Sequence, residues 1–250
     1  MLSGLSIAVV VPAHNEEERV GEVVRTLPSF IDHVFVVDDA SSDATSVVAR
    51  DHGADVFNHS SQRGVGAAIS TGYAEVLRRG IDVAVVMAGD GQMDPDDLEP
   101  LLRPIVEGHA DYVKGNRFRH ADIGHTMPVL RYRVGQTLSL LTRLATGANV
   151  SDTQCGYTAI TRHALRAIES TPMWTGYGYP NDLIGILARA GQRIAEVTVR
   201  PVYRGERSGL RPWHVLKIVR IIAKSGALRA VGHAQRASLG SAWKPRPRSK

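Results

Sequence analysis

The chain has 250 residues, of which 43% are hydrophobic, 22% charged and 6% aromatic. This composition excludes collagen, a coiled coil and a fully disordered chain, and the length suits one large domain or two small ones. The formal net charge is +5, but residues 1–199 carry 17 Lys/Arg against 24 Asp/Glu, whereas residues 200–250 carry 13 against one. An acidic body followed by a basic segment predicts an anionic partner for that segment.

The cysteine content and the N-terminus point to a reducing compartment. Cys155 is the single cysteine, which excludes an internal disulfide and a thiolate zinc cage. The first residues lack the basic region and long apolar stretch of a signal peptide, and no run reaches 18 apolar residues. We therefore expect a cytoplasmic protein that contacts a membrane, if at all, on its inner face.

Short β-branched runs alternate with amphipathic segments along the chain. We expect strands at Ser6–Pro12, His33–Asp38, Val83–Met87 and Asp111–Gly115, and helices at Asp43–His52, Gly64–Arg79 and Asp97–Glu107. Such alternation predicts an α/β fold, Rossmann-like, with a mostly parallel central sheet and helices on both faces. In such sheets, ligands bind beyond the carboxyl ends of the strands.

Three of these strand ends are polar and acidic. They are residues 12–16 (PAHNE), 38–43 (DDASSD) and 89–95 (GDGQMDP). Because crowded carboxylates repel one another unless a cation or a donor-rich ligand separates them, this pattern indicates a metal-assisted nucleotide site. Helix capping is the alternative interpretation for Asp43 and Asp94, which each precede a helix.

Gly64 and Gly66 stand at the start of the second expected helix. They do not form a dinucleotide fingerprint, because Ile69 occupies the third glycine position and the segment follows the third strand, not the first. Glycines at a helix N-terminus allow close approach of an anionic ligand. A tight turn between strand and helix would require the same residues.

Seven motifs follow one another from about Ile7 to Gly209. They are VVVPAHNEE from Val9, VVDDASSD from Val36, RGVGAAISTGY from Arg63, AGDGQMDP from Ala88, KGNRF from Lys114, SDTQCGYTAI from Ser151, and YPNDL from Tyr179 with YRGERSG from Tyr203. In this order they resemble the family 2 glycosyltransferases, and within them the polyprenyl-phosphate (dolichol-phosphate) mannose and glucose synthases. The resemblance implies a GT-A fold that binds a nucleotide-sugar and transfers the sugar with inversion at its anomeric carbon.

The resemblance also implies a donor site. Its members would be Pro12, His14, Glu16, Asp39, Gly64, Gly66, Asp90 and Arg207. Asp39 would accept hydrogen bonds from the base, and Pro12, His14 and Glu16 would wall the nucleoside pocket. Asp90 and Gln92 supply the hard oxygens that Mg²⁺ or Mn²⁺ prefers. The chain departs from the family at Ala88, where a carboxylate is usual, so metal affinity should be lower.

For the acceptor and catalysis, the resemblance singles out Arg117, Arg204 and Asp182. Arg117, with Arg131 and Arg133, would meet an acceptor phosphate, and Arg204 with Arg207 would close over the diphosphate. Asp182, at a helix start after Pro180, would be the general base for a hydroxyl acceptor or simply stabilise the helix terminus. Asp152 would orient sugar or acceptor, and Cys155 would be a small buried hydrophobe.

We therefore expect residues 1–211 to form an inverting glycosyltransferase that uses a UDP-, GDP- or dTDP-sugar and a polyprenyl phosphate. The alternatives are transfer to a small-molecule hydroxyl, a nucleotide-sugar-binding protein with weakened catalysis, and, less in keeping with AHNEE after the first strand, a nucleotidyltransferase. No nucleic-acid partner is expected. The sugar, the base and the oligomeric state, including a homodimer, stay open.

The C-terminal segment has the pattern of a basic amphipathic helix. Val215, Leu216, Val219 and Ile222 recur at helical spacing, with Lys217, Arg220 and Lys224 elsewhere on the turn. The expected helix covers residues 212–236, and its apolar stripe would either pack on the catalytic domain or lie on an anionic bilayer. Residues 237–250 are polar, proline-bearing and basic, which predicts a disordered tail.

Overall fold

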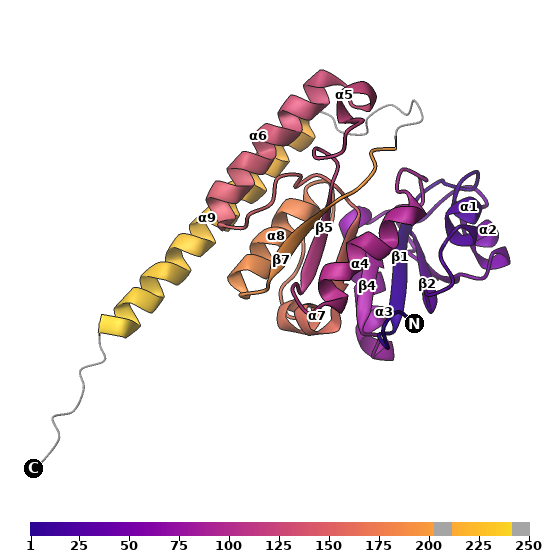
Figure 1. The fold of residues 1–250 in the computed structure, drawn as a ribbon, viewed down its shortest axis with the longest axis horizontal. Coiled ribbons are helices and arrows are strands. Elements are labelled where there is room, and N and C mark those ends of the chain that lie inside the picture. The colour runs from indigo at the N-terminus through magenta and orange to yellow at the C-terminus, as the bar shows by residue number, and fades with distance from the viewer. Residues whose placement is uncertain (203–211, 242–250) are drawn as a thin grey trace, which may run out of the picture.

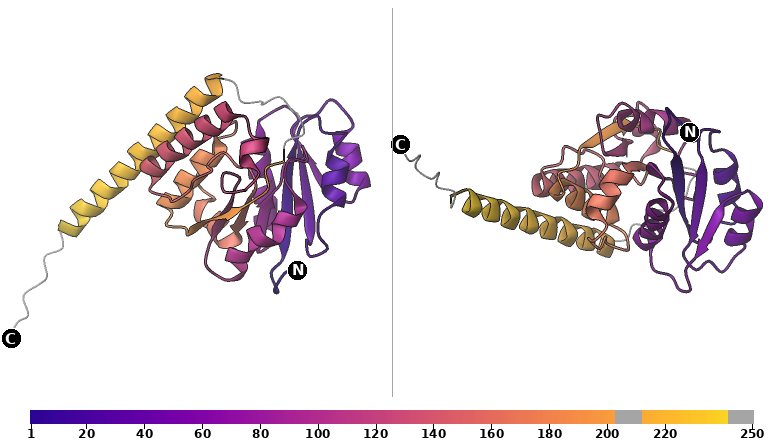
Figure 2. Two further views of the ribbon diagram at one scale, coloured as in Figure 1. Left: turned by 45° about the horizontal axis from the view of Figure 1, so that its top comes forward. Right: turned by 90° about the horizontal axis from the view of Figure 1, so that it is seen from below.

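The computed structural model describes residues 1–202 and 212–241, and in the second range it describes the side chains of residues 213–231. Within these residues, one sheet of seven strands is covered by helices on both faces (Figures 1 and 2). The strands are β1 (Ile7–Ala13), β2 (His33–Asp38), β3 (Asp55–Asn58), β4 (Val83–Val86), β5 (Tyr112–Asn116), β6 (Thr158–Thr161) and β7 (Ile194–Thr198). Their order is β3-β2-β1-β4-β6-β5-β7, with β6 antiparallel to β4 and β5 and the other pairs parallel.

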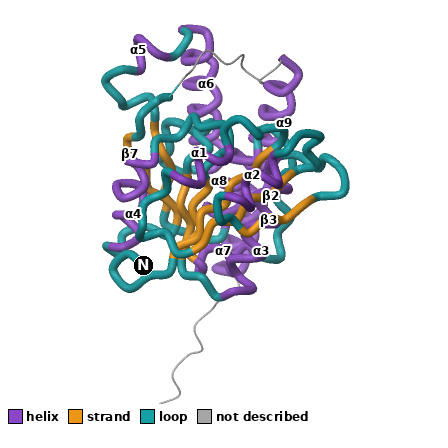
Figure 3. The backbone as a smooth tube through the Cα atoms, turned by 90° about the vertical axis from the view of Figure 1, so that its right-hand side faces the viewer, coloured by secondary structure: helices purple, strands orange, loops and turns teal. Residues whose placement is uncertain are grey.

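The helices surround this sheet, which Figure 3 shows as a central layer of strands. They are α1 (Val20–Arg25), α2 (Thr45–Asp51), α3 (Val65–Arg79), α4 (Leu98–Val106), α5 (Ile123–Thr126), α6 (Val129–Thr146), α7 (Arg162–Ile168), α8 (Tyr179–Arg189) and α9 (Pro212–Ser241). Every strand and helix expected in the N-terminal half is confirmed, with ends within two residues of the prediction. The mostly parallel α/β architecture is confirmed as well.

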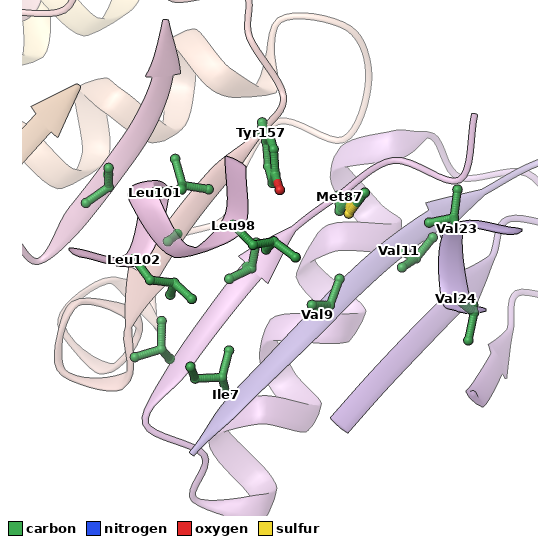
Figure 4. Close-up of a cluster of buried hydrophobic side chains, with 14 of the residues drawn as sticks. Ile7, Val9, Val11, Val23, Val24, Met87, Leu98, Leu101, Leu102 and Tyr157 are labelled. Atoms are coloured by element: carbon green, nitrogen blue, oxygen red, sulfur yellow. The ribbon is translucent and has the colours of Figure 1, made fainter. Parts of the chain in front are cut away.

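Strand β1 shows why the sheet is covered on both faces. Successive side chains of a strand point to opposite faces. Ile7, Val9 and Val11 pack with α1 and α4 (Figure 4), whereas Ala8 and Val10 pack with α3, α7 and α8. All five side chains are fully buried, and each large one stabilises the fold by about 1.5–3 kcal/mol. A strand that is apolar at every position therefore lies in the middle of the sheet.

Helix α9 lies beside α6 and α8 (Figures 1 and 2). Leu138 of α6 packs against Ile218 and Ile222 of α9, with Val215 beside them, whereas Leu216 and Val219 are exposed. Of the apolar stripe expected at the C-terminus, Val215 and Ile222 therefore pack on the catalytic domain, and Leu216 and Val219 do not. Further along, Arg229 donates to the Leu144 carbonyl at 3.3 Å. The helix continues to Ser241, so residues 237–241, expected in a disordered tail, are helical; residues 242–250 lie outside the described part.

Candidate active site

A cavity of about 240 Å³ lies beyond the carboxyl ends of β1, β4 and β5. Its polar wall consists of Asp90, Gln92, Arg117, Arg131, Gln154 and Arg200, and its other lining residues include Pro12, Val65, Cys155, Tyr177, Gly178 and Ile218. Cys155 is 3% exposed and belongs to the hydrophobic core, as expected. The sheet edge predicted to bind a ligand is therefore hollow.

The acidic loops after β1 and β4 approach each other at this edge. Asp90 lines the cavity, and its Oδ1 accepts a hydrogen bond from the Gln92 N–H at 3.0 Å. Burial, followed by the negative charge of Asp90, raises the pKa of Glu16 above its ordinary value. The Gly89 N–H donates to the Pro12 carbonyl at 3.2 Å, so the two loops begin side by side, although Glu16 is not part of the cavity wall.

The residues of this wall suit a divalent cation that is coordinated partly by the phosphates of the substrate. The described residues contain no group of three His, Cys, Asp or Glu side chains arranged to hold a metal ion. Asp90 and Gln92 offer hard oxygens at the cavity, while Ala88 offers none from its side chain. Mg²⁺ commonly binds through one or two carboxylates plus substrate phosphates and water. The described residues therefore fit such an ion and do not form a closed protein cage.

The opposite charge in the cavity comes from arginines. Arg117 follows β5, and its guanidinium donates two hydrogen bonds to Asp152, from Nε to Oδ2 at 2.8 Å and from Nη2 to Oδ1 at 3.0 Å. Burial raises the pKa of Asp152, but the charge and hydrogen bonds of Arg117 and the charge of Lys114 together lower it, so the net shift is downward. Asp152 is fully buried. The prediction was that Asp152 orients the sugar or acceptor. A fully buried carboxylate cannot contact either one directly, and here Asp152 positions Arg117 instead.

Among the other arginines, Arg131 lines the cavity and Arg133 is exposed outside it. Arg200 is a wall residue that no sequence motif indicated. Its Nη1 lies 2.6 Å from Asp94 Oδ2, and Asp94 also caps the short helix at Pro95–Asp97, in agreement with the capping interpretation. Arg200 follows β7, a strand that is not among those predicted from the sequence. Arg200 could therefore not be recognised as a residue at a strand end.

Asp39 lies at the end of β2 and ties it to the turn before α3. Its Oδ1 accepts from His59 Nδ1 at 2.6 Å and from the Arg63 N–H at 2.8 Å, and its Oδ2 accepts from the Gly64 N–H at 2.6 Å. Burial raises the pKa of Asp39, but these hydrogen bonds together lower it below its ordinary value. His14 Nδ1 is 3.0 Å from the Asp39 carbonyl. Neither Asp39 nor His14 lines the cavity.

Gly64 and Gly66 are approached closely by the protein's own backbone. Gly64 has φ +96°, and a Cβ on Gly66 would lie 2.1 Å from the Trp174 carbonyl oxygen. The Gly66 N–H donates to the Thr175 carbonyl at 2.7 Å. The turn and the packing of residues 174–176 thus explain both glycines without a ligand.

Asp182 lies in the first turn of α8, as predicted, but its carboxylate faces a neighbouring loop. Its Oδ2 accepts a hydrogen bond from the Trp174 N–H at 2.8 Å. Tyr179 and Pro180 line the cavity, whereas Asp182, which is 7% exposed, does not. Arg204 and Arg207 lie outside the described residues.

Comparisons with known proteins agree with this geometry. Residues 8–168 match the model of the family described as glycosyl transferase family 2. The chain is 32% identical over 208 residues to an undecaprenyl-phosphate mannosyltransferase of Micrococcus luteus, covering 80% of this chain and 85% of that protein. It is also 32% identical over 205 residues to a polyprenol monophosphomannose synthase of Mycolicibacterium smegmatis, covering 76% and 75%.

Among solved structures, a glucosyl-3-phosphoglycerate synthase of Mycobacterium tuberculosis is similar in fold. That structure, in complex with Mn²⁺, uridine diphosphate and glucosyl-3-phosphoglycerate, superposes with a TM-score of 0.68 over 90% of this chain and 81% of that chain, at 23% identity. At this identity the likeness supports the fold alone. With the family match, it shows that the chain belongs to glycosyl transferase family 2 and has the GT-A fold.

Proposed function

We propose that this glycosyltransferase moves a hexosyl group from a nucleotide-sugar to a polyprenyl phosphate, with inversion at the anomeric carbon. One observation carries the proposal: a single cavity is lined by Asp90 and Gln92 together with Arg117 and Arg131. Such a cavity suits a cation-bound diphosphate and a second phosphate at the same time. The names of the relatives from M. luteus and M. smegmatis support a polyprenyl acceptor.

In the proposed reaction, an oxygen of the acceptor phosphate attacks the anomeric carbon of the sugar. The bond from that carbon to the donor diphosphate breaks, and the nucleoside diphosphate leaves with the electron pair. Arg117, held by Asp152, and Arg131 orient the acceptor phosphate. A divalent cation, Mg²⁺ or Mn²⁺, would stabilise the charge on the departing diphosphate when bound by Asp90 and Gln92.

The remaining donor contacts are proposed from the resemblance. Pro12 lines the cavity and is assigned to the nucleoside. Asp39 is assigned to the base, with His14 and Glu16 beside it, because its Oδ2 accepts the Gly64 N–H and has lone-pair capacity for a second donor. Arg204 and Arg207 are assigned to the diphosphate, where closure would exclude water and suppress hydrolysis.

Transfer to a hydroxyl acceptor would need a general base, and Asp182 is the residue that the sequence offers for it. A phosphate monoester is already anionic at neutral pH and needs none. Because the Asp182 carboxylate accepts the Trp174 N–H and lies outside the cavity wall, the geometry favours the phosphate acceptor.

Product analysis tests this function. The purified protein is incubated with UDP-, GDP- or dTDP-hexoses, with Mg²⁺ or Mn²⁺, and with either a polyprenyl phosphate or the matching polyprenyl alcohol. We expect sugar to enter the organic phase with the phosphate acceptor, accompanied by an equal amount of free nucleoside diphosphate. Transfer to hydroxyl acceptors alone would establish the alternative, and nucleotide binding without release of diphosphate would indicate a binding protein.

We further propose that the outer face of α6 and α9 binds an anionic membrane surface. Both helices carry exposed apolar side chains: Val129, Leu130, Leu140, Leu141 and Leu144 on α6, and Trp213, Leu216, Val219, Leu228 and Val231 on α9. Neither helix contains Asp or Glu, while together they carry Arg131, Arg133, Arg143, Lys217, Arg220, Lys224, Arg229 and Arg236. Basic residues near an anionic bilayer contribute about 1 kcal/mol each.

This face would give reversible attachment. Among residues 1–202 and 212–241, no helix is both long and apolar enough to cross a bilayer. We expect the protein to sediment with anionic vesicles and much less with neutral ones, and high salt to release it. Leu140→Glu with Leu144→Glu should abolish sedimentation, whereas Val47→Glu, at an equally exposed position on α2, should not. The proposal would be contradicted if the protein bound both kinds of vesicle equally and independently of salt, or if it bound neither.

A further inference from the structure

Exposed aromatic rings gather at one place on the molecule. Among the described residues, the exposed large aromatic side chains are Trp174, Tyr177 and Trp213, with 41%, 50% and 48% of their surface accessible. The Tyr177 ring stacks on His214 with centroids 4.6 Å apart, and Trp213 meets His214 edge-on at 5.7 Å. Trp174 Nε1 donates to the Tyr177 carbonyl at 3.1 Å. We call these four residues the aromatic cluster.

The aromatic cluster lies where the cavity meets the start of α9. Tyr177 and Ile218 are wall residues of the same cavity that contains Arg117 and Arg131. The cavity therefore has a cationic part that suits a phosphate and an apolar part that continues to exposed rings. A molecule with an anionic head and an unsaturated hydrocarbon chain is complementary to this arrangement, because its head would meet the arginines and its chain would meet the apolar part and the rings.

The loop that carries Tyr177 is held in place from three sides. The Trp174 N–H donates to Asp182 Oδ2 at 2.8 Å. The Thr175 carbonyl accepts from the Gly66 N–H at 2.7 Å. Gly178, at φ +101°, is packed so closely that a Cβ would lie 3.0 Å from Ile218 Cγ1.

These anchors have a consequence for binding. Because the backbone on both sides of Tyr177 is fixed by residues of α3, α8 and α9, the ring is presented without a need for ordering when a ligand arrives. Preorganised aromatic side chains supply apolar contact area at low entropic cost. The anchoring also gives Asp182, Gly64 and Gly66 a shared structural role next to the cavity.

We propose that the aromatic cluster binds the isoprene units adjacent to the phosphate of the acceptor. This inference rests on the proposed function, since it requires a polyprenyl phosphate whose head is held by Arg117 and Arg131. The methyl groups and double bonds of the first isoprene units would contact Ile218 and the faces of Tyr177 and Trp213 before the chain leaves the protein. Aromatic rings also stack on nucleobases, so the KM of the nucleotide-sugar is measured beside that of the acceptor.

The test compares short acceptors that need neither detergent nor lipid, so that membrane partitioning plays no part. Dimethylallyl, geranyl and farnesyl phosphates carry one, two and three isoprene units. For the wild-type protein we expect the acceptor KM to fall roughly tenfold from the shortest to the longest. Tyr177→Ala and Trp213→Ala should remove most of this dependence and leave the KM of the nucleotide-sugar unchanged. Tyr177→Phe, which keeps the ring, and Val47→Ala, at an exposed site on α2, should keep it.

Each other result has a distinct meaning. Failure to use these three phosphates and a polyprenyl phosphate alike would overturn the proposed function itself. Use of the polyprenyl phosphate but of none of the three short ones would overturn the role of the aromatic cluster. Equal use of all three by the wild-type protein, or an undiminished length dependence in both alanine variants, would overturn the role of the aromatic cluster alone. A rise in the donor KM in Tyr177→Ala, with unchanged melting temperature, would place the ring at the donor and overturn it too.

Discussion

Arg117 owes its place in the cavity to one buried residue. The Asp152 carboxylate accepts from the Arg117 backbone N–H at 3.1 Å and from two guanidinium nitrogens. A buried carboxylate with this much compensation stays charged, and removing one member of such a pair costs about 3–5 kcal/mol. At the scale of single residues, the cavity is therefore built from groups that line it and from groups, such as Asp152, that hold them.

Asp90 is the residue on which metal use should depend. Asp90→Asn keeps an oxygen for the Gln92 N–H but loses the negative charge, so we expect turnover to fall on the order of a thousandfold with no change in melting temperature. The measurement is kcat across a Mg²⁺ or Mn²⁺ titration.

Ala88→Asp should act in the opposite sense and lower the metal concentration that is needed for half-maximal activity. Full wild-type activity in excess chelator would contradict both expectations.

Asp182 should matter more to local structure than to chemistry. Asp182→Asn can still accept the Trp174 N–H, so we expect kcat with a phosphate acceptor to fall less than about tenfold, below the usual range for loss of a general base. Steady-state kinetics and thermal unfolding measured side by side make the distinction. A hundredfold loss of kcat at unchanged stability would identify Asp182 as a base after all.

At the scale of elements, the start of α3 is joined to two other parts of the chain. The Gly64 N–H donates to Asp39 at the end of β2, and the Gly66 N–H donates to Thr175 in the loop before α8. These are amides that have no partner within the helix itself. Helix α3 therefore couples the end of β2 to the loop of the aromatic cluster.

This coupling predicts a cost at Gly66. A Cβ in Gly66→Ala would lie 2.1 Å from the Trp174 carbonyl oxygen, so backbone must move and we expect a loss of about 2 kcal/mol in the free energy of unfolding. Urea unfolding measures it. Gly124→Ala is the matched control in α5, where a Cβ meets nothing within 4 Å, and it should be neutral or slightly stabilising. Equal stability of both variants would mean that the loop can shift freely.

At the scale of the whole molecule, stability should depend on pH through carboxylates that are hydrogen-bonded when folded. Hydrogen bonds from Arg78, and then from Arg79, lower the pKa of Glu75 to about 2 from an ordinary 4.5. A group with a depressed folded pKa contributes stability that is present above its unfolded pKa and is lost as the pH falls through the folded one. For Glu75 this window runs from about pH 4.5 down to about pH 2.

Glu75→Gln tests this dependence. We expect the variant to be about 1 kcal/mol less stable than wild type at pH 7, less than the shift alone implies, because the Arg78 side chain is 68% exposed and water screens the pair. The difference should shrink as the pH is lowered from 5 to 3. Denaturant unfolding at pH 7, 5 and 3 measures it, and a difference that is independent of pH would assign the effect to packing.

The sequence by itself determined the main elements of the N-terminal half and the edge of the sheet where the site lies. Local period and composition decide whether Ile7–Ala13 is a strand and Val65–Arg79 a helix. Once the strands are parallel, their polar ends must share one edge. For that reason the strand pattern places Asp90 and Gln92 at this edge, and the resemblance adds Pro12, Arg117 and Arg131; all five line the cavity.

Only the tertiary structure decided what the other polar groups bind. Asp39 holds the turn before α3, Asp182 holds the loop at Trp174, and Gly66 makes room for Trp174 and Thr175, over a hundred residues away in sequence. A hydrogen bond satisfies a buried carboxylate or amide whether its partner is ligand or backbone. Which partner comes within reach depends on how α3, α8 and α9 pack against the sheet, and no local pattern in the chain specifies that packing.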